Sequence, residues 1–131
     1  MPKILVVDDD KAATALFHQA LMMNRYDVIT LNESSQVLQF AAQEQPDLII
    51  LDLMMPDPDG FKVCRMLRGD AKLRKLPIII VTALNDMDSR LVAIGAGAND
   101  YLVKPFHLDT LFNSVEKLLN KPTDSGRLFQ S

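Results

Sequence analysis

The sequence predicts an α/β fold built on a doubly wound parallel sheet with helices on both faces. Three short runs are apolar without interruption, as is typical of strands buried on both faces of a parallel sheet: Ile4–Val7, Leu48–Leu51 and Pro77–Val81. Longer stretches between them carry apolar residues at helical spacing. Because strand and helix alternate five times along the chain, we expect five parallel strands and five helices.

The first three predicted strands lead up to one carboxylate. Lys3–Val7 forms the first, and the run from Tyr26 to Leu31 alternates more, which places it nearer a sheet edge. Leu48–Leu51 is the third strand, and it stops on Asp52. The loop that follows holds residues that end a strand and redirect the backbone: Pro56, Pro58 and Gly60.

Two helices separate these strands. The first ends near Asn24 and has an inward apolar stripe of Ala13, Leu16, Phe17, Ala20 and Leu21. Its polar residues lie away from that stripe: Lys11, Thr14, His18 and Gln19. The second helix runs from Ser34 to Gln45, where Pro46 stops it.

A third helix follows Gly60, and its apolar positions include Phe61, Cys64 and Leu67. The lone cysteine fits core filling better than a reactive thiol. Basic residues cluster at the end of this helix and in the loop beyond it, namely Arg65, Arg68, Lys72, Arg74 and Lys75. We interpret them as a solvated helix C-terminus favoured by the helix dipole.

The fourth strand, Pro77–Val81, ends at Thr82 and Ala83. The helix after it is capped by Asp88 or Ser89 and turns Leu91 and Ile94 inward.

Gly97 suits the left-handed residue that ends this fourth helix. A short fifth strand, Tyr101–Val103, ends at Lys104 and Pro105. The last helix has the strongest apolar stripe: Leu108, Leu111, Phe112, Val115, Leu118 and Leu119.

The length and net charge of the chain limit the classes of protein to which it can belong. The 131 residues, with a net charge of −3, suit one domain that needs no disulfide. Interspersed charges disfavour nucleic-acid binding by bulk electrostatics, and no apolar run resembles a signal peptide or membrane span. We expect a soluble, cytoplasmic domain over residues 1–121, with 122–131 a flexible tail or the start of a linker.

Polar residues follow the predicted strands at one edge of the sheet: Asp8, Asp9, Asp52, Thr82 and Lys104. Carboxyl ends of parallel strands converge, so these residues form one candidate site. Three carboxylates and one ammonium leave an excess negative charge, which a divalent cation would balance. Oxygen ligands without His or Cys favour Mg²⁺ over zinc.

Asp52 is the predicted nucleophile, because it lies centrally while Asp8 and Asp9 suit metal holding. Its carboxylate oxygen would attack a phosphorus atom in line. Lys104 would neutralise charge on the phosphoryl oxygens, and the Thr82 hydroxyl would donate a hydrogen bond to one of them. The small Ala83 leaves the approach open.

The sequence resembles the receiver domain of bacterial two-component response regulators from Lys3 to about Leu119. The matching motifs are VVDDD at 6–10, DLMMPDPDG at 52–60, VTA at 81–83 and YLVKPF at 101–106. The resemblance implies a flavodoxin-like sheet with strand order 2-1-3-4-5. It also implies a signalling domain rather than an enzyme.

The resemblance further implies that Asp52 accepts a phosphoryl group from a sensor histidine kinase, a phosphotransfer protein or acetyl phosphate. Asp9, Asp52 and the Met54 backbone carbonyl would bind Mg²⁺ directly, and Asp8 through water. Thr82 and Tyr101 resemble the family's switch pair. Phosphorylation would then change which effector binds the face formed by the fourth helix, fifth strand and fifth helix, in a monomer or a phosphorylation-dependent dimer.

Two hypotheses concern this chain's own residue choices. Apolar Met54 and Leu84 would shield the phosphoryl group from water and prolong its lifetime. The phosphodonor protein would meet the exposed side of the first helix, with Lys11, Thr14 and His18, and the loop at Pro105 and Phe106.

Two alternatives remain open at the level of sequence. A haloacid dehalogenase-like phosphatase also uses a strand-end Asp and Mg²⁺, but it needs a second Asp where this chain has Met54. The other alternative is a receiver-like protein-binding module that is never phosphorylated.

Overall fold

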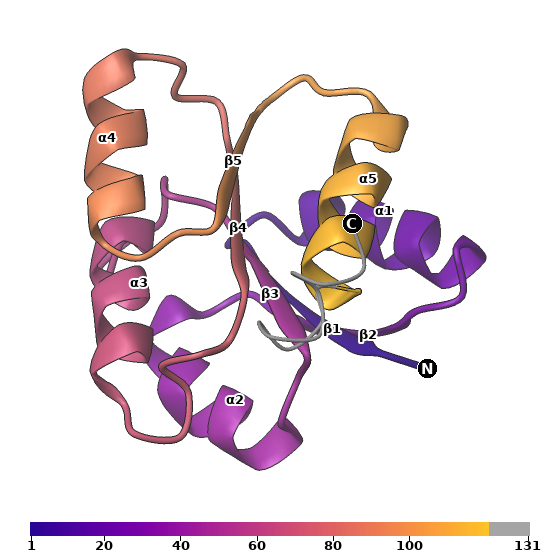
Figure 1. Ribbon diagram of the computed structural model, residues 1–131, viewed down its shortest axis with the longest axis horizontal. Coiled ribbons are helices and arrows are strands. Elements are labelled where there is room, and N and C mark those ends of the chain that lie inside the picture. Colours follow the sequence, from indigo (N-terminus) through magenta and orange to yellow (C-terminus); the bar gives the residue numbers. More distant parts are fainter. Residues whose placement is uncertain (121–131) are drawn as a thin grey trace, which may run out of the picture.

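The computed structural model describes residues 1–120 and contains a five-stranded parallel sheet in the order β2-β1-β3-β4-β5 (Figure 1). The predicted strand order is confirmed. The strands are β1 (Lys3–Val7), β2 (Asp27–Leu31), β3 (Leu48–Leu51), β4 (Ile78–Thr82) and β5 (Asp100–Val103). Strand β2 pairs with β1 alone and so forms an edge, as its alternating sequence predicted. The predicted tail, 122–131, lies outside the described residues.

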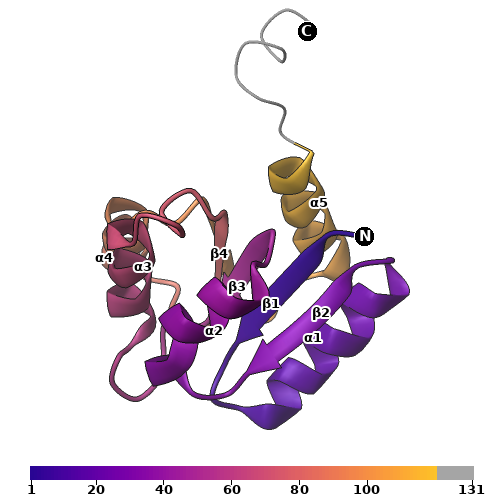
Figure 2. The same cartoon turned by 90° about the horizontal axis from the view of Figure 1, so that it is seen from below.

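Helices cover both faces of the sheet, as the alternation of elements predicted. Figures 1 and 2 show α1 (Lys11–Met23) and α5 (Leu108–Leu119) on one face. The opposite face carries α2 (Val37–Glu44), α3 (Gly60–Gly69) and α4 (Met87–Gly95). The predicted second helix begins as a separate 3-10 turn, η1 (Ser34–Gln36), before α2. No helix within residues 1–120 is both long and apolar enough to cross a membrane.

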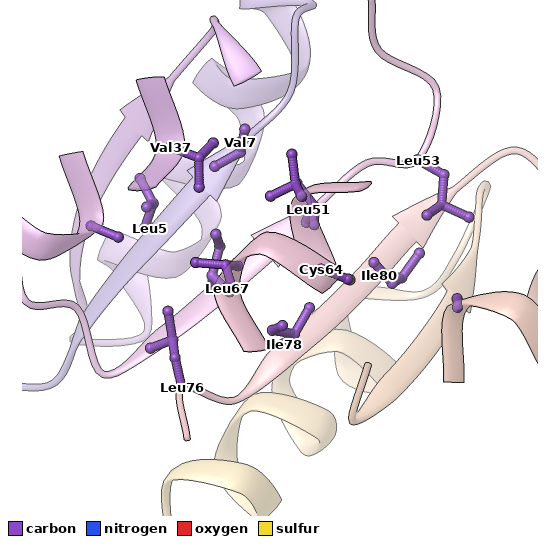
Figure 3. Packing of buried hydrophobic residues seen from close by; sticks show 14 of the residues in the cluster. Leu5, Val7, Val37, Leu51, Leu53, Cys64, Leu67, Leu76, Ile78 and Ile80 are labelled. Carbon is purple, nitrogen blue, oxygen red and sulfur yellow. The ribbon is translucent and has the colours of Figure 1, made fainter. Parts of the chain in front are cut away.

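Alternation along the strands creates two hydrophobic cores, one on each face. In β1, Leu5 and Val7 pack toward α2 and α3, whereas Ile4 and Val6 pack toward α1 and α5. Figure 3 shows part of the first core, where Cys64 of α3 lies among strand side chains. Burial raises the pKa of the Cys64 thiol to about 11, so it stays protonated at neutral pH. Its predicted place in the core is confirmed.

Helix α1 departs from the predicted stripe at two positions. Thr14 is buried, although we placed it outside the stripe, and Leu16 is 69% exposed, although we placed it inside. Burial of Thr14 is tolerated because its hydroxyl donates to the Lys11 carbonyl and accepts from the Asn32 side-chain amide. The helix therefore packs through Phe17 and Leu21, and Leu16 points toward solvent.

Helix α4 departs further from the prediction. Asp86 caps it by accepting from the Ser89 backbone N–H at 2.9 Å, so the predicted caps Asp88 and Ser89 are wrong by a few residues. Leu91 and Ile94 are 59% and 52% exposed rather than inward. Ala93 is the only fully buried residue of this helix, and Ala96 at its C-terminal end packs partly against the core. Gly97, with φ of 112°, confirms the predicted left-handed residue after α4.

The basic cluster at the end of α3 and in the loop beyond it includes one residue that is not simply solvated. The Arg68 guanidinium donates to the backbone carbonyls of Leu76 and Gly97 and to the Asn99 side-chain oxygen, at 2.7 to 3.0 Å. It also reaches the Arg74 carbonyl at 3.0 Å. Our interpretation of Arg68 as a dipole-favoured surface charge is therefore wrong. Its fork of donors joins α3 to the turn between α4 and β5.

Candidate functional site

Three of the predicted residues converge at the carboxyl edge of the sheet. Asp8 follows β1, Asp52 follows β3 and Lys104 follows β5. The Lys104 ammonium lies 3.1 Å from Asp8 Oδ2 and 3.0 Å from Asp52 Oδ2. Both carboxylates are buried, so these two ion pairs, which share Lys104, lie mostly out of water. Residues up to 96 positions apart thus share one site, as the parallel sheet predicted.

The backbone fixes how both carboxylates face the lysine. Asp8 Oδ1 accepts the backbone N–H of Asp10 at 2.9 Å, and Asp52 Oδ1 accepts that of Met54 at 3.0 Å. In each case a short polar side chain binds its own chain two residues ahead, as turn-forming Asp residues do. One oxygen of each carboxylate is therefore held by the loop, and the other faces Lys104.

Burial and charge pull in opposite directions on these groups. Burial raises the pKa of Asp8 above its usual value, although the Asp10 N–H and the Lys104 ammonium act against that rise. Burial would by itself lower the pKa of Lys104, but hydrogen bonds and charge from Asp52 and Asp8 raise it overall. Lys104 is therefore charged at neutral pH and is the site's resident cation.

Thr82 and Tyr101 both bind the backbone of one residue, Leu84. The buried Thr82 hydroxyl oxygen accepts the Leu84 backbone N–H at 3.4 Å, and the Tyr101 hydroxyl donates to the Leu84 carbonyl at 2.8 Å. Tyr101 is 5% exposed, so its ring lies inward in this conformation. Ala83 is exposed and Leu84 is half-buried.

Asp9 takes no part in the contacts with Lys104, although it directly follows Asp8 in the chain. It is exposed and lines a hollow of about 260 Å³ that also contains Ser34, Pro56 and Asp57. Within residues 1–120, no group of three or more His, Cys, Asp or Glu residues lies close enough to hold a metal ion. Met54 offers its backbone N–H to Asp52, and its side chain is 55% exposed at the rim.

An apolar groove lies beside the site, between α1 and the loop after β5. It encloses about 650 Å³, and its lining includes Leu16, Met23, Phe106 and Leu108. The Phe17 and Phe106 rings stack at 5.8 Å and form part of its floor. Sequence periodicity did not find this groove, because it assigned Leu16 to the core.

Comparison with known proteins agrees with this architecture. The profile of the response regulator receiver domain family matches residues 4–116. The chain is 40% identical over 121 residues to the DNA-binding dual master transcriptional regulator RpaA of Synechocystis, covering 92% of this chain and 50% of RpaA. It is 41% identical over 126 residues to response regulator MprA of Mycobacterium tuberculosis, covering 95% and 54%. The chain therefore spans about half the length of these curated relatives.

Solved structures give the same result. The receiver domain of Klebsiella pneumoniae RstA in its BeF3-activated form superposes with a TM-score of 0.85 at 30% identity, covering 90% of this chain and 98% of that one. The Vibrio cholerae chemotaxis protein CheY4 gives 0.85 at 28% identity, covering 91% and 99%. These relatives form a signalling family rather than a catalytic enzyme family, which removes the phosphatase alternative. The chain belongs to the response regulator receiver domain family.

Proposed function

We propose that Asp52 accepts a phosphoryl group from the phosphohistidine of a sensor histidine kinase or phosphotransfer protein. The observation that carries this proposal is the buried Lys104 ammonium held between the carboxylates of Asp8 and Asp52 at 3.1 and 3.0 Å. An oxygen of Asp52 would form the bond to phosphorus while the bond to the donor's ring nitrogen breaks and its electron pair leaves with the donor. Lys104 would shift toward the new phosphoryl oxygens and offset their charge.

Mg²⁺ fits the donor chemistry of this edge. Asp8, Asp9, Asp52 and the Met54 carbonyl offer only oxygen atoms, the ligands that Mg²⁺ prefers. When bound, the ion would reduce the repulsion between the carboxylates and an incoming phosphoryl group. In our proposal Asp52 and Asp9 bind it directly and Asp8 acts through water.

Thr82 and Tyr101 are the proposed switch pair. Thr82 accepts the Leu84 N–H and Tyr101 donates to the Leu84 carbonyl, so movement of the Thr82 hydroxyl toward a phosphoryl group would free the Leu84 N–H. The change would then reach α4, β5 and α5, whose face we propose as the contact for a downstream effector. RpaA is described as DNA-binding, but this domain's net charge of −3 favours a protein contact over direct DNA binding.

The groove along α1 is the proposed docking surface for the phosphodonor protein. It adjoins Lys104 and Pro105, and its exposed Leu16 and Met23 offer an apolar contact beside the reacting carboxylate. Pro105 and Phe106 line the groove, whereas the buried Thr14 and the exposed Lys11 and His18 do not. Phosphorylation-dependent pairing of two receivers would use the face formed by α4, β5 and α5.

Replacing Leu16 tests the docking surface. A Leu16→Ser variant is expected to slow phosphoryl transfer from a phosphorylated histidine kinase about tenfold or more, because it removes apolar contact area worth roughly 1.5 to 3 kcal/mol when buried. Labelling by acetyl phosphate should stay unchanged, since that small donor needs no protein contact. Met22→Ser, on the same helix but outside the groove lining, is the matched control. Equal transfer rates for the two variants would count against this surface.

The acceptor itself is tested by mass. Incubation with acetyl phosphate and Mg²⁺ is expected to add the mass of one phosphoryl group to the wild-type chain and none to Asp52→Asn. Asp57→Asn, which changes an exposed carboxylate of the same loop, should be labelled normally. Removing Mg²⁺ with a chelator should slow labelling by at least about tenfold, as expected for loss of charge neutralisation. Labelling of Asp52→Asn at the wild-type rate would refute the assignment.

The lifetime of the phosphoryl group tests the proposed shielding by Met54 and Leu84. Met54→Asn is expected to shorten the half-life of phosphorylated Asp52 several-fold, because a polar side chain at this rim position can orient an attacking water. Met54→Leu should keep the long lifetime. The measurement is the decay of the phosphorylated mass after removal of acetyl phosphate. If phosphorylated Met54→Asn decays no faster than the phosphorylated wild type, the shielding hypothesis is wrong.

A further inference from the structure

Arg90 of α4 lies over the ring of Tyr101. Its guanidinium carbon is 5.1 Å from the ring centroid, within the range of an attractive cation–π contact. Among the described residues, no carboxylate lies within salt-bridge distance of Arg90. The aromatic face is therefore the guanidinium's defined contact, although Arg90 itself lies at the surface.

This contact is notable because α4 has little buried surface of its own. The helix buries only Ala93, while its larger apolar residues Met87, Leu91 and Ile94 point outward. One methyl group contributes little to holding a helix in a fixed position on a sheet. Arg90 therefore adds a side-chain contact between α4 and the sheet, and this contact ends on the proposed switch residue.

From the ring, the contacts continue to the strand end. The Tyr101 hydroxyl donates to the Leu84 carbonyl, and the Leu84 N–H donates to the Thr82 hydroxyl oxygen. An unbroken set of contacts thus runs from α4 through Arg90, Tyr101 and Leu84 to Thr82. A ring that swung outward would lose both the hydrogen bond to Leu84 and the contact with Arg90.

We infer that Arg90 is a positioning residue of the switch, which holds the Tyr101 ring inward and so couples the position of α4 to the loop that carries Leu84. This inference deepens the proposed function and rests on it for its biological meaning. An exposed cation–π contact changes a two-state ratio roughly two- to fivefold, so Arg90 biases the ring without locking it. A bias of this size leaves the ring responsive to a charge change at Asp52.

The chain has only two tyrosines, Tyr26 and Tyr101, which allows a direct test by fluorine NMR of protein labelled with 3-fluorotyrosine. The outward fraction of Tyr101 is measured from the solvent isotope shift of its resonance, with Tyr26 as internal reference. Arg90→Gln is expected to raise the outward-to-inward ratio about two- to fivefold. Arg90→Lys keeps a cation and should restore most of the inward population. Arg65→Gln, an exposed arginine on α3, should match wild type.

An Arg90→Gln resonance that superposes on the wild-type one would overturn the inference. So would an equal change in Arg65→Gln, because it would show a general charge effect. The measurement needs no phosphodonor, so its outcome is independent of whether Asp52 is phosphorylated. Failure of the mass test at Asp52 would refute the proposed function and leave the role of Arg90 in positioning Tyr101 intact.

Discussion

Gly60→Ala is expected to destabilise the domain by about 3 kcal/mol and to abolish phosphoryl labelling in any protein that still folds. A Cβ atom at position 60 would lie 2.4 Å from the Asp52 carbonyl oxygen and 2.6 Å from Leu53 Cα. Both are backbone atoms, so no side chain can rotate away. The first turn of α3 would have to move off the strand end that carries the acceptor, and the Gly60 N–H would lose its 3.1 Å bond to the Leu53 carbonyl.

The measurement is urea unfolding of Gly60→Ala beside a matched control from the same helix. Gly69→Ala is that control, because a Cβ at position 69 meets nothing within 4 Å. It should leave stability unchanged or raise it by up to about 1 kcal/mol through lower unfolded-state entropy and better helix propensity. If the two variants had the same midpoint, close approach at Gly60 would not be what positions Asp52.

Arg68→Ala is expected to cost about 2 to 3 kcal/mol of unfolding free energy, far more than an ordinary surface arginine. Arg68 makes five hydrogen bonds to three carbonyls and one side-chain oxygen. Its removal leaves the Gly97 and Leu76 carbonyls without this donor in a half-buried place. Hydrogen bonds to a charged donor are worth about 1.5 to 3 kcal/mol each before solvent exposure reduces that figure.

Thermal and urea unfolding of three variants would check this role of Arg68. Arg68→Lys keeps the charge but lacks the planar fork of donors, so it should recover less than half of the lost stability. Arg65→Ala, on the same helix, should change stability by less than about 0.5 kcal/mol. In Arg68→Ala, amide hydrogen exchange should accelerate at Gly97 to Asn99, next to α4. A loss of under 0.5 kcal/mol in Arg68→Ala would contradict a bracing role.

Local pattern was sufficient for much of this fold. The apolar runs of β1, β3 and β4 are long enough and continuous enough to exclude a half-exposed strand, and the structure places all three inside the sheet. Parallel pairing then brought Asp8, Asp52 and Lys104 to one edge without any further information. Strand order came from the resemblance, because strand patterns alone do not say which neighbours pair.

Burial on the helices was harder to predict. Helical spacing shows which side of a helix is apolar, but in each turn it does not decide which of two neighbouring residues faces the sheet. On α1 and α4 the sheet meets a narrower face than the apolar residues suggest, so Leu16, Leu91 and Ile94 remain outside the core. Their exposure matters for function, since they lie on the two surfaces that we propose for partners. Helical spacing cannot distinguish an apolar residue that packs into the core from an exposed one that is available to contact another protein.

By itself, the sequence determined the fold class, the edge of the sheet that carries the chemistry and the residue types gathered there. Only the tertiary structure divided the three consecutive acids: Asp8 pairs with Lys104, Asp9 is exposed, and Asp10 caps α1 through the Ala12 N–H. The structure alone also showed that Arg68 braces Gly97 and that Arg90 covers Tyr101. The physical reason is the sequence separation over which each feature is determined. Strands and helices follow from neighbours along the chain, whereas a side chain's partner depends on where distant backbone lies.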